Sequence, residues 1–153
     1  MKWIVRRKWK RMTMLLDHPG GPLRGQMIVC TWNVRAPWAP KTEVQKFLNK
    51  HKISAVGLLE TRVRVNNSAK IQKRFGSAWK WLSNYSYSPK GRIWVGWLHQ
   101  DVELNVVNVH EQYLHSCVHN KNGGFTCFLT IVYGLHSVDS RLLLWSVGCL
   151  EVW

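Results

Sequence analysis

The sequence lacks a long hydrophobic run, because Lys, Arg, Asn, His or Gly interrupts every apolar stretch before the ~20 residues that a membrane-spanning helix requires. It also lacks a secretory signal, since the start MKWIVRRKWKRM has no uninterrupted apolar core. Four cysteines are present, but none of them form a C-x-x-C pair. We therefore expect no membrane partner, an intracellular location and reduced, buried thiols.

Acidic residues are also scarce. Eight Asp and Glu stand against 22 Lys and Arg, which gives a formal net charge of +14. Such an excess attracts polyanions through a field that reaches about a Debye length, roughly 8 Å at physiological salt. Nucleic acid is the commonest polyanion, so we expect DNA as a partner, although charge says nothing about sequence preference.

Composition divides the chain into a basic lead and a patterned remainder. Residues 1–26 hold seven basic residues and one acidic residue, and they include the turn-forming stretch DHPGGPLRG. We expect this segment to be a disordered lead, and an organellar transit peptide or a nuclear address are the alternatives. Residues 27–153 are about the size of one domain and are expected to hold the folded part.

The remainder begins with a pattern typical of α/β proteins. Residues 27–34, MIVCTWNV, and residues 53–62, ISAVGLLETR, are apolar runs of strand length. Between them, TEVQKFLNKH has apolar residues at helical spacing behind Thr42, which predicts a capped helix. A strand, a helix and a strand in this order predict a crossover unit whose strands are parallel.

Further along, the pattern changes to β. A short helix is expected to close at Gly76. The stretches that follow, up to Gly134, are rich in aromatic and β-branched residues and are separated by turn signals, which predicts successive antiparallel strands. Leu142 to Trp145 then offer one apolar face of a last helix.

Two polar residues close the first two predicted strands: Asn33 and Glu60. If these strands are parallel neighbours, both side chains emerge at one edge of the sheet, where α/β proteins place their ligand sites. An amide oxygen and a carboxylate suit Mg²⁺ that is held partly by water. The structural alternative is that Asn33 caps a turn and Glu60 pairs with Arg62 or Arg35.

Six blocks occur in an order that resembles a known family: CTWNVR, GLLETR, GRIWVGW, VVNVH, FTCFLTIVYG and SRLLLW. They resemble the endonuclease/exonuclease/phosphatase superfamily, and are most similar to the N-terminal half of the apurinic-endonuclease-like domain of plant LINE-type (non-LTR) retroelements. The resemblance covers residues 27 to about 148. It implies an α/β (α+β) fold, namely a partial four-layer sandwich with one mixed sheet, flanking helices and a second sheet that is largely missing.

The resemblance also implies a reaction, the Mg²⁺-dependent hydrolysis of phosphodiesters in DNA. Asn33 matches the family's asparagine near the metal and the phosphate, and Glu60 matches its metal-binding glutamate. Tyr133 falls where the family keeps a tyrosine near the scissile phosphate. The expected metal ligands are therefore Glu60 and Asn33, and the expected catalytic residues are Tyr133 and Asn33. Arg141 with Trp145 resembles a helix signature that is chiefly structural.

The sequence departs from the family in three respects. The Asp-x-Asn and Ser-Asp-His blocks have no counterpart after Tyr133, and Ala36 and Pro37 replace a glycine in the loop after Asn33. Without a general base, turnover falls by on the order of 10⁴ to 10⁶. We therefore expect an inactive nuclease remnant, a pseudoenzyme with weak or absent Mg²⁺ binding. The alternative is a basic nucleic-acid-binding protein without catalysis.

An incomplete sandwich has a further consequence. The apolar face of residues 125–132 would lie open, which predicts self-association, or completion of the sandwich by another chain in trans.

Two other patterns allow binding chemistry. His115, Cys117 and His119 alternate on one face of a predicted strand, which is compatible with zinc but also with ordinary outward polar residues. His110 and His136 are expected at the surface or in turns. The tryptophans interleaved with Lys and Arg could stack on single-stranded nucleic acid, but we expect most of them to pack in the core.

Overall fold

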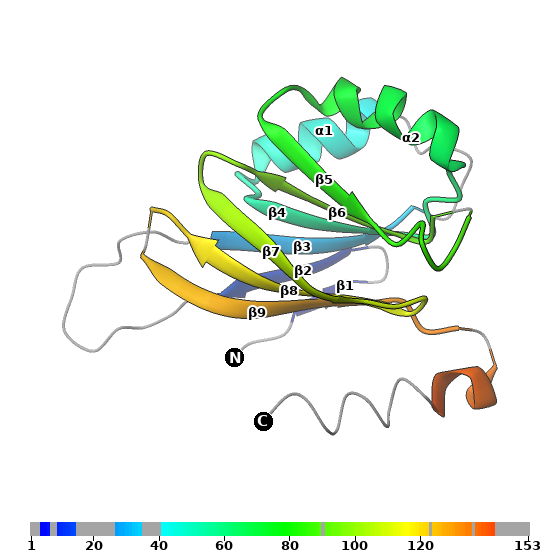
Figure 1. Cartoon of the computed structure of the whole chain (residues 1–153). Helices are drawn as coiled ribbons and strands as arrows, with labels where there is room; N and C mark the ends of the chain where they lie inside the picture. The colour runs from blue at the N-terminus through cyan, green and yellow to red at the C-terminus, as the bar shows by residue number, and fades with distance from the viewer. Residues whose placement is uncertain are drawn as a thin grey trace.

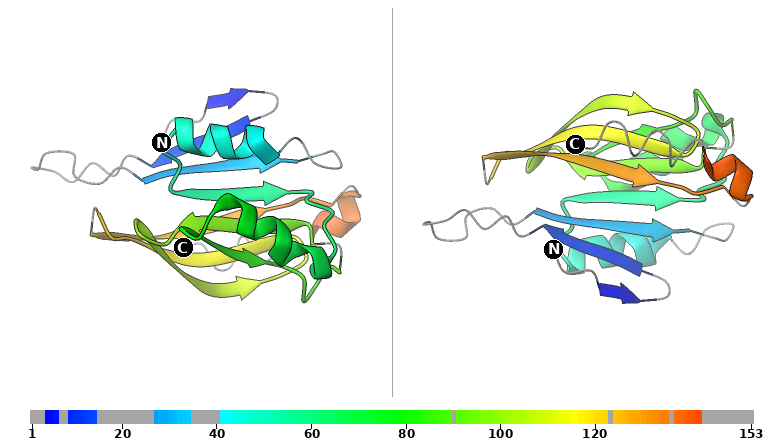
Figure 2. Two further views of the ribbon diagram at one scale, coloured as in Figure 1. Left: turned by 90° about the horizontal axis from the view of Figure 1, so that it is seen from above. Right: turned by 90° about the horizontal axis from the view of Figure 1, so that it is seen from below.

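The computed structural model describes residues 4–6, 9–14, 27–34, 41–89, 91–122, 124–135 and 137–142. Within them the chain forms three layers (Figure 1). A six-stranded mixed sheet lies in the middle, helices cover one of its faces and a three-stranded antiparallel sheet covers the other. Figure 2 shows the helical layer from above and the smaller sheet from below.

The larger sheet has the strand order β1-β2-β3-β4-β6-β5. Strands β3 and β4 are parallel and are joined through helix α1, which confirms the predicted crossover unit. The six strands of the larger sheet are β1 (Ile4–Arg6), β2 (Trp9–Met14), β3 (Met27–Asn33), β4 (Ala55–Leu59), β5 (Trp79–Ser83) and β6 (Ile93–Leu98). Because β6 is antiparallel to β4, the start of β6 lies at the edge where β3 and β4 end.

Strands β1 and β2 lie in the segment that was predicted to be a disordered lead. Strand β2 pairs with β3 from Trp9 opposite Trp32 to Met14 opposite Met27, and β1 pairs with β2. Backbone pairing at the edge of β3 accounts for these strands. The boundary at residue 26 stays a prediction. Several predicted positions lie outside the described residues, namely Arg35, Ala36, Pro37, His136, Trp145 and Cys149.

The helical layer consists of α1 (Lys41–Lys50), α2 (Val65–Gln72) and the 3₁₀ turn η1 (Lys73–Phe75). Val44 and Leu48 are four residues apart on α1 and are both buried against the sheet, as the sequence pattern predicts. Gly76 follows η1 with a φ of 97°, a conformation that favours glycine, so the predicted end of this helical segment is confirmed. No helix among the described residues is long and apolar enough to cross a membrane.

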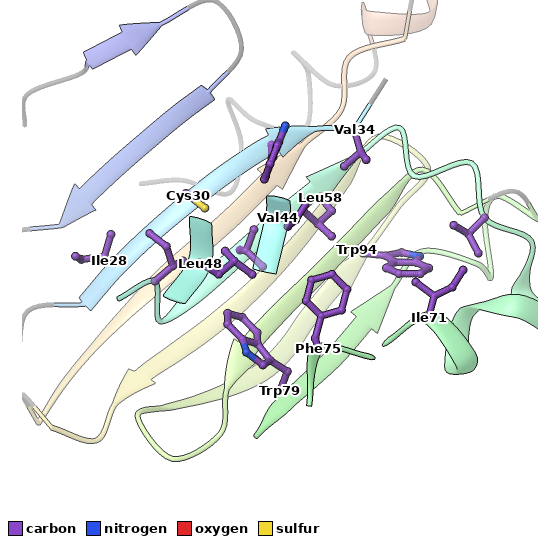
Figure 3. Close-up of a cluster of buried hydrophobic side chains, with 14 residues drawn as sticks. Ile28, Cys30, Val34, Val44, Leu48, Leu58, Ile71, Phe75, Trp79 and Trp94 are labelled. Carbon is purple, nitrogen blue, oxygen red and sulfur yellow. The ribbon is translucent and has the colours of Figure 1, made fainter. Parts of the chain in front are cut away.

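Aromatic side chains fill the space between the helices and the larger sheet. We call Phe75, Trp79, Trp81 and Trp94 the tryptophan cluster (Figure 3 labels Phe75, Trp79 and Trp94). The ring centroids of Phe75 and Trp81 lie 4.8 Å apart, and those of Trp81 and Trp94 lie 5.9 Å apart. Trp94 is fully buried. The prediction that most tryptophans of this region pack in the core is therefore confirmed.

The smaller sheet consists of β7 (Val102–Val109), β8 (Tyr113–Asn120) and β9 (Phe125–Val132), in that order. Its inward side chains form a second core with those of the larger sheet, and this core includes Val29, Ala55, Val95, Leu114, Val118, Leu129 and Ile131. The two sheets approach closely at Gly57, where an added Cβ would lie 2.8 Å from Cγ2 of Ile131. The residue at this position therefore has to be small.

The apolar face that was predicted to lie open is covered. Leu129 and Ile131 are 3% and 2% exposed, because they face the larger sheet. Phe128 and Val132, on the opposite face of β9, are exposed instead. Self-association through the inward face therefore has no support in the described part of the chain. The predicted α+β class, a partial sandwich with a mixed sheet and flanking helices, is confirmed, and three strands represent its second sheet.

Candidate metal and phosphate site

The structure brings Asn33 and Glu60 together at one edge of the larger sheet. The parallel register places Asn33 opposite Leu59, so Glu60 follows directly beside it. The Nδ2 of Asn33 donates a hydrogen bond to Oε1 of Glu60 over 3.0 Å. The ends of β3 and β4 that carry them lie at the right-hand edge of the sheet in Figure 1. The adjacency that the sequence predicted is therefore present.

The Glu60 side chain is buried, with 7% of its surface exposed, whereas Asn33 is exposed. Within the described residues no basic side chain forms an ion pair with Glu60, and Arg62, the partner considered for it, is exposed. A buried carboxylate is unfavourable unless a cation or several hydrogen bonds compensate its charge. The one hydrogen bond from Asn33 leaves this carboxylate suited to a cation.

The turn that carries Glu60 has an unusual backbone. Glu60 and Arg62 have φ angles of 55° and 51°, in the left-handed region. For residues other than glycine such conformations cost about 1–3 kcal/mol each. The start of β6 holds this turn, because the N–H of Glu60 donates to the carbonyl of Arg92 over 2.8 Å. The hydroxyl of Thr61 also donates to the carbonyl of Gly91 over 2.5 Å.

Tyr85 connects this turn to the tryptophan cluster. Its hydroxyl donates to the carbonyl of Val63 over 2.9 Å and accepts from Nε1 of Trp94 over 3.1 Å. Burial raises the pKa of the Tyr85 phenol above its ordinary value. Gly91, with a φ of 51°, lies against the same ring, and an added Cβ there would overlap it. The Glu60 turn is thus supported by the core.

Tyr133 lies just after β9 and is buried. Its N–H donates to the carbonyl of Gln112 over 2.7 Å. The guanidinium carbon of Arg92 lies 5.6 Å from the centroid of the Tyr133 ring, which is a cation–π distance. Since the backbone of Arg92 also holds Glu60, Arg92 links the two predicted residues and places a positive charge beside Tyr133.

Arg92 was not predicted from the sequence. The available signal is its place directly before a strand antiparallel to β4, which puts it at the edge where β4 ends. To use this position one must know that β4 pairs with β6, and the local sequence pattern does not show which strands pair.

Arg141 lies in the short helical segment after Tyr133, and its predicted structural role with Trp145 stays a prediction. Its Nε donates to the carbonyl of Ser137 over 3.3 Å, within the segment where residues 138–142 are helical. Gln112, almost fully buried, fastens the same segment: its Nε2 donates to the carbonyl of Ser140 over 2.6 Å, and its Oε1 accepts from the N–H of Leu135 over 3.3 Å. The chain after Tyr133 is therefore held at the site edge.

The donor set fits magnesium better than zinc. The described residues contain no group of three His, Cys, Asp or Glu side chains that could hold a metal. His115 and His119 instead contact Thr130 and Thr126, with Nδ1 to Oγ1 distances of 2.8 and 2.9 Å. Mg²⁺ accepts one or two protein oxygens and completes its shell with water and phosphate. Glu60 can supply one, and Asn33 a second if its amide is turned to present Oδ1.

Comparison with known proteins shows similarity in structure only. No protein-family model and no curated protein matches the sequence. The endonuclease domain of TRAS1, a telomere-specific non-LTR retrotransposon, is similar with a TM-score of 0.60 and 9% identity, over 80% of this chain and 52% of that one. The human Nocturnin catalytic domain with bound sulfate anion is similar with a TM-score of 0.51 and 11% identity, over 79% and 55%.

These similarities show the class of fold, which is the endonuclease/exonuclease/phosphatase type of sandwich that the sequence blocks predicted. At identities of 9% and 11% the likeness shows the fold alone, and this is the fold that the resemblance to non-LTR retrotransposon endonucleases implied. The chain spans about half of the length of each of these two structures.

Proposed function

We propose that this chain provides the N-terminal half of a Mg²⁺-dependent phosphodiesterase site for DNA. Glu60 and Asn33 would bind the metal, and Tyr133 and Arg92 would contact the phosphate. The observation that carries the proposal is the buried Glu60 carboxylate, which has no basic partner among the described residues and lies where strand ends of both sheets meet. The nuclease fold of the TRAS1 domain adds support.

Each residue of this site would have a separate role in binding the metal or the phosphate. A bound magnesium ion would polarise a phosphoryl oxygen and stabilise the leaving oxygen. Without a metal, Asn33 orients the Glu60 carboxylate through its hydrogen bond, and the fixed turn keeps that carboxylate in place. With a metal, the Asn33 amide would turn to present Oδ1 instead. Arg92 attracts the phosphate, and the Tyr133 ring limits the positions that its guanidinium can take.

We further propose that these 153 residues do not hydrolyse DNA by themselves. Among the described residues, no three His, Cys, Asp or Glu side chains lie close enough together to hold a metal, and Glu60 is the carboxylate identified at this site. A hydrolytic site needs a base for the attacking water, and loss of a catalytic unit lowers turnover by on the order of 10⁴ to 10⁶. Weak Mg²⁺ binding without cutting is the expected behaviour.

Calorimetric titration with Mg²⁺ tests the metal site. We expect weak binding by the wild-type chain and none by Glu60→Gln, which keeps the shape of the side chain but removes its charge. Glu103→Gln is the matched control, because Glu103 is exposed on β7 in the smaller sheet. Equal affinity in all three proteins would refute the metal site. Plasmid nicking that disappears in Glu60→Gln would refute the proposed inactivity instead.

The second candidate function is nucleic-acid binding without any metal chemistry, which the net charge of +14 favours. It requires that affinity for DNA falls steeply with salt, because binding then releases counterions. Arg92→Gln should reduce the slope of log K against log salt by about 0.7 for a single strand, the value for one phosphate contact. An unchanged slope would show that Arg92 does not touch phosphate.

A further inference from the structure

A stack of three aromatic rings lies beside the site, on side chains that the proposed function does not use. We call Tyr87, His110 and Tyr113 the edge stack. The ring centroids of Tyr87 and His110 lie 5.8 Å apart, and those of His110 and Tyr113 lie 5.2 Å apart, with interplanar angles of 38° and 20°. Tyr113 is buried, but Tyr87 at the other end is 54% exposed. The stack therefore presents an open ring to solvent.

Asn84 joins the edge stack to the phosphate side of the site. Its side chain is fully buried, and its Nδ2 donates to the carbonyls of His110 and Glu111 over 3.4 and 3.0 Å. Its Oδ1 accepts from the N–H of Arg92 over 3.2 Å, and its carbonyl accepts from the N–H of Tyr87 over 3.0 Å. One residue thus fixes the two turns that carry Tyr87 and His110 relative to Arg92.

Gln112 makes a second connection, to Tyr133. The N–H of Gln112 donates to Nδ1 of His110 over 3.3 Å, and its carbonyl accepts from the N–H of Tyr133. The hydroxyl of Tyr113 accepts from Nδ2 of Asn108 over 3.3 Å. The His110 and Tyr113 rings are therefore held before any ligand arrives, and Tyr87 packs against the first of them. A support that is already in place lowers the entropy cost of stacking.

The edge stack lies where the base next to a phosphate bound at Arg92 would reach it. Strands β4, β6 and β5 are adjacent, so the turn after β5 lies two strand spacings, about 10 Å, from the end of β4. Arg92 lies directly before β6, the strand between them. A nucleic acid strand whose phosphate lies at Arg92 could place its next base against Tyr87.

We propose that the edge stack is a nucleobase platform, on which the open face of Tyr87 stacks an unpaired base of a single strand. This inference rests on the proposed function for the phosphate at Arg92. Bases inside a duplex are covered on both faces by their neighbours, so a protein ring stacks on bases that are unpaired or splayed out. Stacking on a tyrosine tolerates every base, because each base has a π face.

Fluorescence anisotropy with a labelled single strand of about 12 nucleotides, within the usual site sizes of single-strand binders, tests the platform in EDTA. We expect Tyr87→Ala to bind roughly 5- to 150-fold more weakly than the wild type, as for loss of one base–aromatic stack. Tyr87→Phe keeps the ring and should keep the affinity. Because Tyr87 is exposed, neither change should alter the thermal unfolding temperature.

Phe128→Ala is the matched control. Phe128 is 65% exposed and stacks on His115 with centroids 5.3 Å apart, but it lies on the outer face of β9, away from the site edge. We expect this variant to bind as the wild type does. Wild-type affinity in Tyr87→Ala would overturn the proposal, as would an equal loss in Phe128→Ala or in Tyr87→Phe.

A strand that carries 2-aminopurine reports stacking directly. Its fluorescence should be quenched on binding to the wild type and to Tyr87→Phe, and it should stay bright with Tyr87→Ala. Equal quenching by all three would overturn the platform. These measurements are made without metal, so they test the platform independently of the metal site. If DNA binding depends on Tyr87 but the titration detects no Mg²⁺ binding, only the metal site is refuted. Mg²⁺ binding without Tyr87 dependence would remove only the platform.

Discussion

Two groups of aromatic rings in this protein have similar ring separations but different surroundings. In the tryptophan cluster, the centroids of Trp81 and Trp94 lie 5.9 Å apart, and in the edge stack those of Tyr87 and His110 lie 5.8 Å apart. Helices and the larger sheet cover the first group, and Trp94 is fully buried. Tyr87 in the second group is more than half exposed. Ring separation therefore does not distinguish packing from binding, whereas exposure does.

The two groups are physically connected. Trp94 donates to the hydroxyl of Tyr85, which holds the Glu60 turn, and Asn84 at the end of β5 holds the edge stack. The core thus fixes the site edge through two short chains of hydrogen bonds. Variants in the tryptophan cluster should change stability, variants in the edge stack should change binding, and variants at the connections should change both.

The largest effect is expected from Trp94→Ala. Removing a fully buried tryptophan leaves a cavity and should lower the free energy of unfolding by about 3–5 kcal/mol. Urea denaturation followed by circular dichroism measures the loss. Tyr87→Ala is the comparison and should change the free energy of unfolding by no more than about 0.5 kcal/mol. If the two variants lost similar stability, the distinction between the two aromatic groups would fail.

Asn84→Ala should have the next largest effect. It leaves two carbonyls and two N–H groups without their partner, at a cost of about 2–4 kcal/mol in the free energy of unfolding. It should also weaken single-strand binding, because His110 and Arg92 lose their common anchor. Asn105→Ala, at an exposed position of β7, is the control for both measurements. A stable Asn84→Ala protein with normal affinity would disprove the connection.

The smallest effect concerns pH and Tyr85. Burial raises the pKa of its phenol above the ordinary 10.0, so the unfolded state loses this proton first as pH rises. The stability that Tyr85 contributes is therefore fully present below the unfolded-state pKa of 10.0. It is lost as the pH rises from there through the higher pKa of the folded state. Wild-type stability should fall more steeply with alkaline pH than that of Tyr85→Phe, by at most about 1.4 kcal/mol per pH unit, the limit for one proton. Parallel melting curves across that pH range would contradict this.

Much of the central fold could be predicted because its patterns are local. The apolar runs of β3 and β4 and the spacing of Val44 and Leu48 on α1 predict a parallel pair, and that pair brings Asn33 beside Glu60. The pairing of β2 was missed, since a strand rich in Lys and Arg carries no apolar alternation. In the structure β2 lies between β1 and β3, so backbone pairing on both of its sides holds it in the sheet.

The environment of β9 was predicted incorrectly for a related reason. Alternation in residues 125–132 predicts two different faces but does not say which face meets another sheet. The structure turns Leu129 and Ile131 towards the larger sheet and leaves Phe128 outside. The metal, catalytic and partner assignments, including Mg²⁺ at Glu60 and Asn33 and the part taken by Tyr133, stay predictions.

The class of fold, the basic charge and the neighbouring positions of Asn33 and Glu60 could be read from the amino-acid order, because each depends on periodicity, composition or the geometry of two adjacent parallel strands. The contact of Arg92 with Tyr133, and the hydrogen bonds by which Asn84 joins Tyr87, His110 and Arg92, became visible in the folded chain alone. These contacts join turns from different sheets that are distant along the chain. Such turns meet only when both sheets have folded and packed, so no local pattern encodes them.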